Sequence, residues 1–393
     1  MTLRMKPLLG LPALGCAAAL CLVATGAPAQ NYPNKPIRLI VPFAQGRRTG
    51  SRRGGWCWGG DGARPPGLWH RILRRFATTL VAVASFSAVA SFAQPYPSKP
   101  VRLIVPFGPG GGSDYVGRLV GVKLTEQLGQ TVVVDNRPGA ASLVGTEIVM
   151  RASPDGYTLL LADSGFTINI AYYKQAKYDA LKDFDPVTVV GEAPYLLVVS
   201  PGLPYAGNLK DYIAAAKSQP RKINLGSAGN GSGTHFSGEL FKLRAGVTIT
   251  HVPYKSAGAS VADVVGGQIQ STMTSPPPAL SLAKAGRLRI LAQATAKRTA
   301  LLSDIPTFEE GGVSGVYVTN WYSVMSVGGT PKPVLKRLHD ELMRAIAAPD
   351  TLQRLAAGAL EPAPTTPEQF RNKIAGELQR WAAVVKDAHI QQE

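Results

Sequence analysis

A glycine-rich segment at residues 106–114, PFGPGGGSD, is the first stretch whose residue types and spacing could do chemistry. Glycines let a backbone approach a ligand without side chains in the way. A helix that follows such a turn presents free N–H groups and a partial positive charge, so the segment can bind an anion. We predict that Ser113 caps this helix and that Asp114 lies in its first turn, where an acid suits the dipole. The alternative is a plain strand-to-helix turn.

A second segment, NLGSAGNGSGTHFSGELF at residues 224–241, repeats the order of apolar run, Gly- and Ser-rich turn and helix. Ser227, Asn230 and Ser232 carry neutral hydrogen-bonding groups that could meet a carboxylate from the opposite half of the protein. His235 in the same segment is more often a packed or capping residue than a ligand, and the histidines lack metal-ligand spacing.

A third segment, MTSPPPAL at residues 273–280, is too rich in proline to continue a central strand. We predict a rigid loop here, which brings Thr274 and Ser275 to the edge of a cleft.

These loops match enzyme motifs only in part. Gly108 and Gly110 fit a dinucleotide fingerprint, but Ser113 stands where its last glycine belongs, and Asp135 ends the second expected strand. No Walker lysine follows the glycines, and the residues around Ser232 do not form a nucleophile elbow. We therefore predict no catalytic residues, no metal site and no cofactor. A nucleotide-dependent enzyme is the weaker alternative.

Alternating strand and helix patterns must position these loops. Expected strands lie at residues 101–107, 131–134, 157–162, 196–199, 223–226, 249–252 and 288–292. Expected helices follow Ser113, begin after an Asn208 cap, lie near 235–243 and 260–265, start at Pro333, and follow a capping box of Thr366 and Gln369. This alternation predicts right-handed βαβ units and parallel strands, in two α/β halves. Such chains bind ligands beyond the carboxyl ends of their strands.

The charge of the chain is unevenly distributed. Twelve of the 42 Lys and Arg residues but one of the 25 acids fall within residues 1–94, so residues 95–393 carry only +6 of the formal +17. That surplus is too mild and too dispersed to indicate nucleic acid, but it suits an anionic ligand. All three cysteines also lie in residues 1–94, so the expected folded part tolerates an oxidising compartment without disulfides.

The first 94 residues contain two similar beginnings. Residues 1–30 have a basic start, an apolar run and a small-residue cleavage site, as in a secretory signal, and residues 71–94 repeat that design. Residues 31–70 contain YPNKPIRLIVPFAQG at 32–46, a truncated copy of YPSKPVRLIVPFGPG, and continue as an irregular linker rich in Arg, Gly and Trp. We interpret residues 1–94 as the remnant of a tandem duplication. The alternative is a genuine N-terminal extension.

Several motifs taken together resemble the substrate-binding proteins of tripartite tricarboxylate transporters, the Bug family. They are YPSKPVRLIVPFGPGGGSD, VVVDNRPGA, SPDGYTLLLA, SAGNGSGTHFSGELF, HVPYKSAGA with GGQI, AKAGRLRILA and DIPTFEEGG, spread over residues 95–388. The resemblance implies an α/β, type II periplasmic binding protein fold with two Rossmann-like lobes joined by crossing strands, near residues 195–200 and 318–323. Lobe 1 would comprise residues 95–196 plus 318–393, and lobe 2 residues 197–317.

The resemblance also implies a ligand site, in which the first glycine-rich loop holds a carboxylate, often with ordered waters. The candidate ligand-binding residues of lobe 1 are Phe107, Gly108, Pro109, Gly110, Gly111, Ser113, Asp114 and Ser164, and those of lobe 2 are Ser227, Ala228, Gly229, Asn230, Ser232 and Thr274. Many family members carry Asp at the position of Thr274, where an acid could pair with the ammonium of an amino acid. Its absence here favours a plain carboxylate.

The function that the resemblance implies is capture rather than catalysis. We expect a secreted, periplasmic monomer that closes its lobes on a small organic acid and delivers it to membrane transporter subunits, with no nucleic acid partner. A sensor that presents the ligand to a signalling receptor is the alternative.

Overall fold

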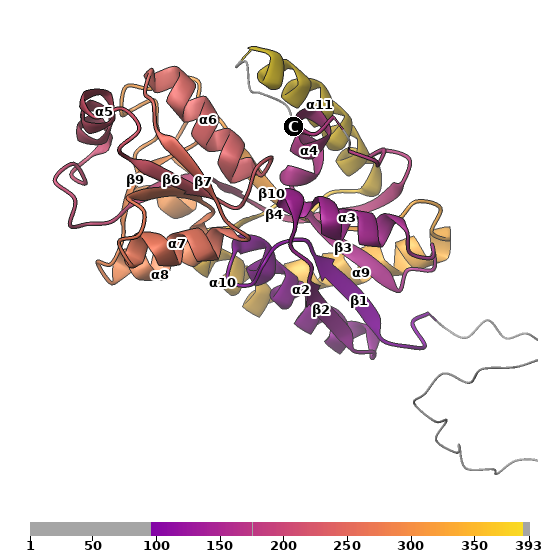
Figure 1. Ribbon diagram of the computed structural model, residues 1–393. Coiled ribbons are helices and arrows are strands. Elements are labelled where there is room, and N and C mark those ends of the chain that lie inside the picture. The colour runs from indigo at the N-terminus through magenta and orange to yellow at the C-terminus, as the bar shows by residue number, and fades with distance from the viewer. Residues whose placement is uncertain (1–95, 175, 388–393) are drawn as a thin grey trace, which may run out of the picture. The chain divides into compact units, whose positions relative to one another are not determined.

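The computed structural model describes residues 96–174 and 176–387. The two signal-like segments, the truncated duplicate and the linker predicted from the sequence lie outside the described residues. Two sheets with their own helices make up the described part, and we call them lobe 1 and lobe 2 (Figure 1).

Lobe 1 is built on a six-stranded sheet with the order β11-β4-β10-β3-β1-β2. Three of its strands are parallel: β1 (Val101–Val105), β2 (Val132–Asn136) and β3 (Thr158–Asp163). The others are antiparallel to their neighbours: β4 (Phe184–Pro194), β10 (Thr319–Val327) and β11 (Glu361–Pro362).

Lobe 2 is built on a five-stranded sheet with the order β7-β6-β8-β5-β9. Its parallel strands are β6 (Asn224–Ser227), β7 (Thr250–Pro253) and β8 (Ser271–Thr274). β5 (Leu196–Val199) runs antiparallel to β8, and β9 (Arg289–Gln293) at the sheet edge runs antiparallel to β5. In both lobes, therefore, a parallel group of strands adjoins strands that arrive from the other lobe.

The chain passes between the sheets at two adjacent points. Tyr195 separates β4 from β5, and Val318 immediately precedes β10. Backbone hydrogen bonds join Tyr195 N to Val318 O (3.4 Å), Val318 N to Ala294 O (2.9 Å) and Ala294 N to Tyr195 O (2.8 Å). The crossing segments thus lie side by side and form the connection about which the lobes could move.

Helices cover both faces of each sheet, which explains why strands such as β1, β3 and β5 are mostly apolar rather than alternating between apolar and polar residues. In lobe 1 they are α2 (Gly112–Leu128), α3 (Leu143–Met150), α4 (Gly165–Tyr172), α9 (Lys332–Ala347), α10 (Pro349–Ala357) and α11 (Pro367–Asp387). In lobe 2 they are α5 (Leu209–Ser218), α6 (Gly233–Ala245), α7 (Ala257–Val265) and α8 (Pro276–Lys284). Leu103 and Ile104 of β1 accordingly belong to different core clusters.

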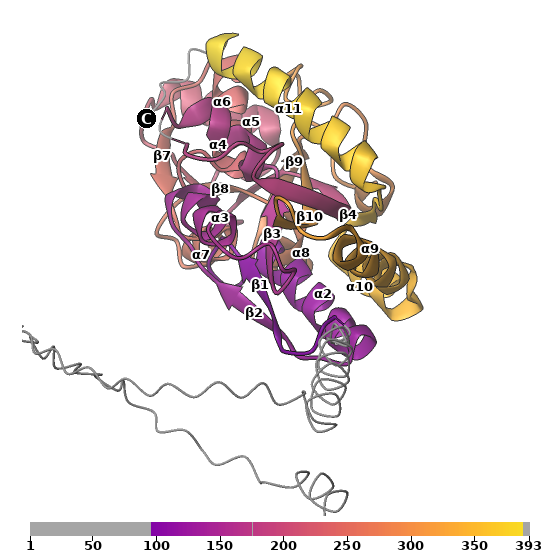
Figure 2. The ribbon, with the colours of Figure 1, turned by 90° about the vertical axis from the view of Figure 1, so that its right-hand side faces the viewer.

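Helix α11 links the two lobes through apolar packing. It lies along α4 in lobe 1 (Figure 2). Its Trp381 is buried in the core cluster of lobe 2, where the ring meets Phe236 edge to face at 5.9 Å. None of the described helices is both long enough and apolar enough to cross a membrane.

The expected fold class is confirmed, and two locally predicted helix starts hold as well. The Asn208 side chain accepts from Asp211 N, and Thr366 and Gln369 exchange the two hydrogen bonds of a capping box (2.9 and 3.2 Å).

Two local predictions are wrong. Helix α2 begins at Gly112 with Gly111 as its N-cap, and Ser113 lies inside the first turn because its hydroxyl donates to Asp163 instead. The three prolines after Ser275 do not form a loop. They begin α8, where the first turn needs no backbone N–H, and Thr274 is the last residue of β8.

Candidate functional site

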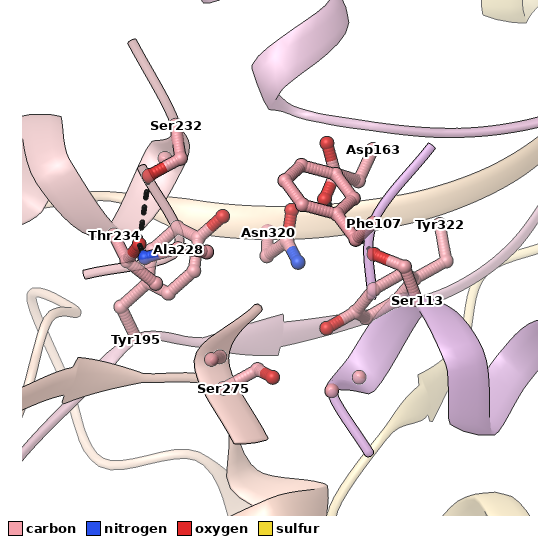
Figure 3. A pocket seen from close by; sticks show the side chains of 14 residues that line it. Phe107, Ser113, Asp163, Tyr195, Ala228, Ser232, Thr234, Ser275, Asn320 and Tyr322 are labelled. Atoms are coloured by element: carbon pink, nitrogen blue, oxygen red, sulfur yellow. Dashed lines mark hydrogen bonds between the residues drawn. The ribbon is translucent and has the colours of Figure 1, made fainter. Parts of the chain in front are cut away.

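A small cavity lies between the lobes, where the carboxyl ends of the parallel strands face one another (Figure 3). Its volume is about 20 Å³, room for about one water molecule. It is lined by Phe107, Gly111, Gly112, Ser113, Asp163, Tyr195, Ala228, Ser232, Gly233, Thr234, Ala257, Ser275, Asn320 and Tyr322. Both lobes and both crossing segments therefore contribute to one site.

Two helix N-termini open into this cavity, α2 from lobe 1 and α6 from lobe 2. Each begins with a glycine that has no room for a side chain. A Cβ on Gly112 would lie 2.5 Å from Ser275 Oγ, and a Cβ on Gly233 would lie 2.6 Å from Ser164 Oγ. Hydroxyl groups of Ser275 and Tyr322 pack against Gly112, and those of Ser164 and Tyr195 pack against Gly233. The N–H groups and partial positive charges of both helix ends therefore lie at a polar cavity, which suits an anion.

The glycine-rich loop before α2 is held in place by Asp114. This carboxylate accepts hydrogen bonds from Gly110 N (3.1 Å) and Asn136 Nδ2 (3.0 Å) and pairs with Arg118. Asn136 also donates to Phe107 O (3.0 Å). Burial alone would raise the pKa of Asp114, but the hydrogen bonds from Arg118, Gly110 and Asn136 lower it below its ordinary value. Asp114 therefore remains charged and fixes the loop.

The loop before α6 is held by its own hydroxyl groups. Ser232 Oγ donates to Gly229 O (2.6 Å) and accepts from His235 N, while Thr234 Oγ1 accepts from Ala228 N (2.8 Å). His235 Nδ1 accepts from Gly231 N. His235 therefore packs and caps within the loop, as the sequence favoured.

The crossing segments place two tyrosine hydroxyls at the cavity. Tyr195 Oη contacts Ser164 Oγ (2.9 Å), and Ser164 Oγ donates to Asn320 Oδ1 (2.8 Å). Tyr322 Oη lies beside Ser275 and Asn320, yet among the described residues it is a buried atom with no hydrogen bond of ordinary geometry. Burial raises the pKa of both tyrosines, so both hydroxyls keep their protons and can donate.

The acid at this site is Asp163, the last residue of β3. It is 7% exposed. Its Oδ2 accepts from Ser113 Oγ (3.1 Å) and its Oδ1 from Gly165 N (3.0 Å). No Lys, Arg or His lines the described cavity, so Asp163 has no cationic partner there.

Five of the candidate residues from the sequence line the cavity: Phe107, Gly111, Ser113, Ala228 and Ser232. A neighbouring hollow of about 370 Å³ shares Phe107 and Ala228 with the cavity and takes in Gly229 and Asn230.

The remaining candidates lie next to the cavity rather than on it. Ser164 contacts the cavity residue Tyr195 through its hydroxyl group. Ser227 Oγ contacts His251 Nε2 (2.6 Å). Thr274 is fully buried and its hydroxyl donates to Ser275 O. Gly108, Pro109 and Gly110 lie at contacts between the lobes, and Asp114 braces the loop as described above.

The lobes touch directly beside the cavity. Gly108 N donates to Lys255 O (3.0 Å), and Ser256 Oγ donates to Pro109 O (3.2 Å). On another side, Tyr173 Oη donates to Asn230 O (2.7 Å). These contacts join the glycine-rich loop of lobe 1 to the start of α7 and the α6 loop of lobe 2, so the cleft is closed.

The sequence did not single out several residues at the cavity: Gly112, Asp163, Tyr195, Gly233, Thr234, Ala257, Asn320 and Tyr322. A signal existed for some of them. Asp163 follows the third expected strand and precedes Ser164, and Tyr195 and Tyr322 fall within the two expected crossings. In the described part of the chain, no group of three or more His, Cys, Asp or Glu is placed to hold a metal.

Comparison with known proteins shows which family the chain resembles. Residues 116–390 match the model of the tripartite tricarboxylate transporter family receptor, TctC. Protein BugT of Bordetella pertussis is 35% identical over 315 residues, which cover 78% of this chain and 96% of that protein.

Solved structures agree with this assignment. An R. palustris protein solved with adipate is 34% identical and superposes with a TM-score of 0.73, covering 76% of this chain and 100% of that one. MatC from Rhodopseudomonas palustris with bound malate is 28% identical, with a TM-score of 0.71 and coverage of 74% and 100%. The chain therefore belongs to the tripartite tricarboxylate transporter receptor family, the Bug proteins, which includes periplasmic solute-binding proteins.

Proposed function

We propose that this protein captures a small organic carboxylate in the periplasm, as a monomer, by closing its lobes and then delivers it to a tripartite tricarboxylate-type transporter. One observation carries the proposal: the N-termini of α2 and α6 open from opposite lobes into the same cavity, each behind a glycine. Two helix ends with free N–H groups suit an anion that both lobes must touch at once.

The other groups at the cavity support a carboxylate in preference to a phosphate or a nucleotide. The described lining offers neutral donors and no basic side chain, whereas phosphates are commonly held by Arg or Lys. Relatives with bound adipate and malate are consistent with this choice of ligand class. We extend it to this chain as a plain carboxylate without an ammonium group.

Binding would require the cleft to open. A cavity of about 20 Å³ has no room for a dicarboxylate. We propose that residues 95–196 with 318–393, and residues 197–317, move as two bodies about the crossings at Tyr195 and Val318. The ligand then stabilises the closed form by making contacts to both lobes that the open form lacks.

A thermal-shift panel would test the ligand class. The panel contains mono-, di- and tricarboxylates, aromatic acids, amino acids and NAD, and we expect one class of plain carboxylate to stabilise the full chain. A ligand at 100 times its dissociation constant adds about 2.7 kcal/mol of apparent stability, which a raised midpoint reveals. A shift with NAD alone would overturn the proposal.

Tyr322→Phe should weaken carboxylate binding while leaving the free protein as stable as before. Tyr322 Oη is buried at the cavity without a hydrogen bond of ordinary geometry among the described residues, so removing it breaks no such hydrogen bond in the free form. A hydrogen bond to a charged ligand contributes about 1.5–3 kcal/mol, which predicts a loss of roughly 10- to 100-fold in affinity by calorimetry.

Tyr178→Phe is the matched control for that experiment. Tyr178 Oη donates to Phe166 O away from the cavity lining, so this variant should lose about 1 kcal/mol of stability and keep its affinity. Equal losses of affinity in both variants would mean that Tyr322 Oη does not touch the ligand.

A further inference from the structure

Asp163 presents an electrostatic problem to any carboxylate that enters the cleft. It lines the cavity and is 7% exposed, and the described lining contains no cation to pair with it. Burial raises the pKa of Asp163 to about 6, although hydrogen bonds from Ser113 and Gly165 oppose the shift. A buried carboxylate without a positive partner is costly, and proteins usually relieve that cost by neutralising the group.

A ligand carboxylate in the same cavity would increase the free-energy cost of a charged Asp163. Two carboxylates that share one site repel each other, so one of them binds a proton more tightly than it would alone. The helix ends at Gly112 and Gly233 favour the charged form of the ligand. Asp163 already has a raised pKa, so it is the group that takes the proton. A protonated Asp163 can also donate its O–H to a ligand oxygen.

We propose that Asp163 receives the ligand in its protonated form, so that one carboxylate and one proton enter the cleft together. This inference rests on the proposed function, because it assumes that the cleft holds a carboxylate. Asp163 thereby becomes a specificity-determining residue: it accepts an anion when protonated, and it would favour a cation when charged.

Other titratable groups around Asp163 do not supply this proton. Burial raises the pKa of Tyr178, Tyr195 and Tyr322, so these side chains stay neutral near pH 7. Burial lowers the pKa of His235 to about 4 and of His251 to about 3, so both are neutral as well.

The charged side chains nearby are otherwise engaged or peripheral. Asp114, next along α2, is paired with Arg118. Glu377 of α11 accepts from Thr167 Oγ1 (2.8 Å) and Trp321 Nε1 (2.9 Å), and none of these three residues lines the cavity. Lys255 borders the neighbouring hollow rather than the cavity.

The sign of the effect follows from the direction of the pKa shift. Above about pH 6 the protonated fraction of Asp163 falls tenfold per pH unit, and ligand that binds only the protonated form weakens equally. Adipate and malate are both fully ionised between about pH 6.5 and 8.5, so their own titration does not interfere.

The test is calorimetry of the full chain with adipate, malate and aspartate across that pH window. Wild-type affinity for adipate or malate should fall about 100-fold from pH 6.5 to 8.5, and buffers of different ionisation heat should report uptake of about one proton at pH 8. Asp163→Asn keeps an N–H donor without a charge and should bind with constant affinity across the window. Asp155→Asn, at a partly exposed site beside Lys99 and away from the cavity lining, should retain the wild-type slope.

The remaining outcomes distinguish the failure of the proton inference from the failure of the proposed carboxylate capture. A flat wild-type profile, or a dependence that Asp163→Asn preserves, overturns the proton inference and leaves carboxylate capture intact. Tight binding of aspartate that Asp163→Asn abolishes shows that Asp163 pairs with an ammonium group, which also overturns it. If no carboxylate binds either protein at any pH, the proposed function fails and the inference fails with it.

Discussion

Gly112→Ala should reduce carboxylate affinity by at least about 100-fold. The added Cβ would lie 2.5 Å from Ser275 Oγ and 2.9 Å from Tyr322 Cζ, in the space in front of the α2 N-terminus. Overpacking of this kind costs about 1–3 kcal/mol, and displaced hydrogen bonds to a charged ligand cost about 1.5–3 kcal/mol more. Titration calorimetry with a carboxylate identified by the panel measures the loss.

Gly117→Ala separates this effect from simple destabilisation. Gly117 lies on the same helix, but its Cβ would meet Val105 Cγ2 at 2.6 Å in the core of lobe 1, away from the cavity. This control should lower the unfolding midpoint and leave affinity unchanged. Gly233→Ala, the counterpart of Gly112 on α6, should behave like Gly112→Ala because the same space in lobe 2 is filled. Normal binding by Gly112→Ala would rule out the α2 N-terminus as part of the site.

The strands were predictable because the apolar residues that form each of them lie next to one another in the sequence. Both faces of each sheet are covered, so β1, β3 and β5 are mostly apolar, and their expected positions match the structure to within two residues at each end. Asn208 and the capping box of Thr366 and Gln369 were predictable for the same reason, since each helix start is satisfied within four residues.

The cavity walls were harder to predict because they depend on contacts between distant segments. Tyr322 is opposite Asp163 in the register of β10 and β3. No pattern in the sequence around either residue predicts that pairing. Ser113 illustrates the same limit. Its position suggested an N-cap, but Asp163, 50 residues away, takes its hydrogen bond. Residue chemistry predicted the two glycine-rich loops, whereas the direction of each side chain required the fold.

Gly258→Ala should trap the protein in a more open form and lower its affinity for the carboxylate about tenfold or more. Gly258 is the second residue of α7, and its Cβ would lie 2.5 Å from Gly110 O and 2.6 Å from Gly110 C across the cleft. The backbone carbonyl of Gly110 cannot rotate away from this contact as a long side chain could. When the lobes separate, the methyl group no longer meets Gly110, and Ala favours the helix by up to about 1 kcal/mol over Gly.

The variant therefore separates closure from folding, which no substitution inside the cavity can do. Small-angle scattering should show a larger radius of gyration with saturating carboxylate than the wild type shows, while the unfolding midpoint of the free protein stays the same or rises. Gly266→Ala, at the other end of α7, is the matched control, because its Cβ would meet only ordinary contacts within lobe 2. A Gly258→Ala protein that closes normally would mean that the loop at 108–110 yields, and that contact with α7 does not govern closure. If it stays open but binds as tightly as the wild type, one lobe supplies the affinity alone, and the convergence of α2 and α6 on one cavity has no role in binding.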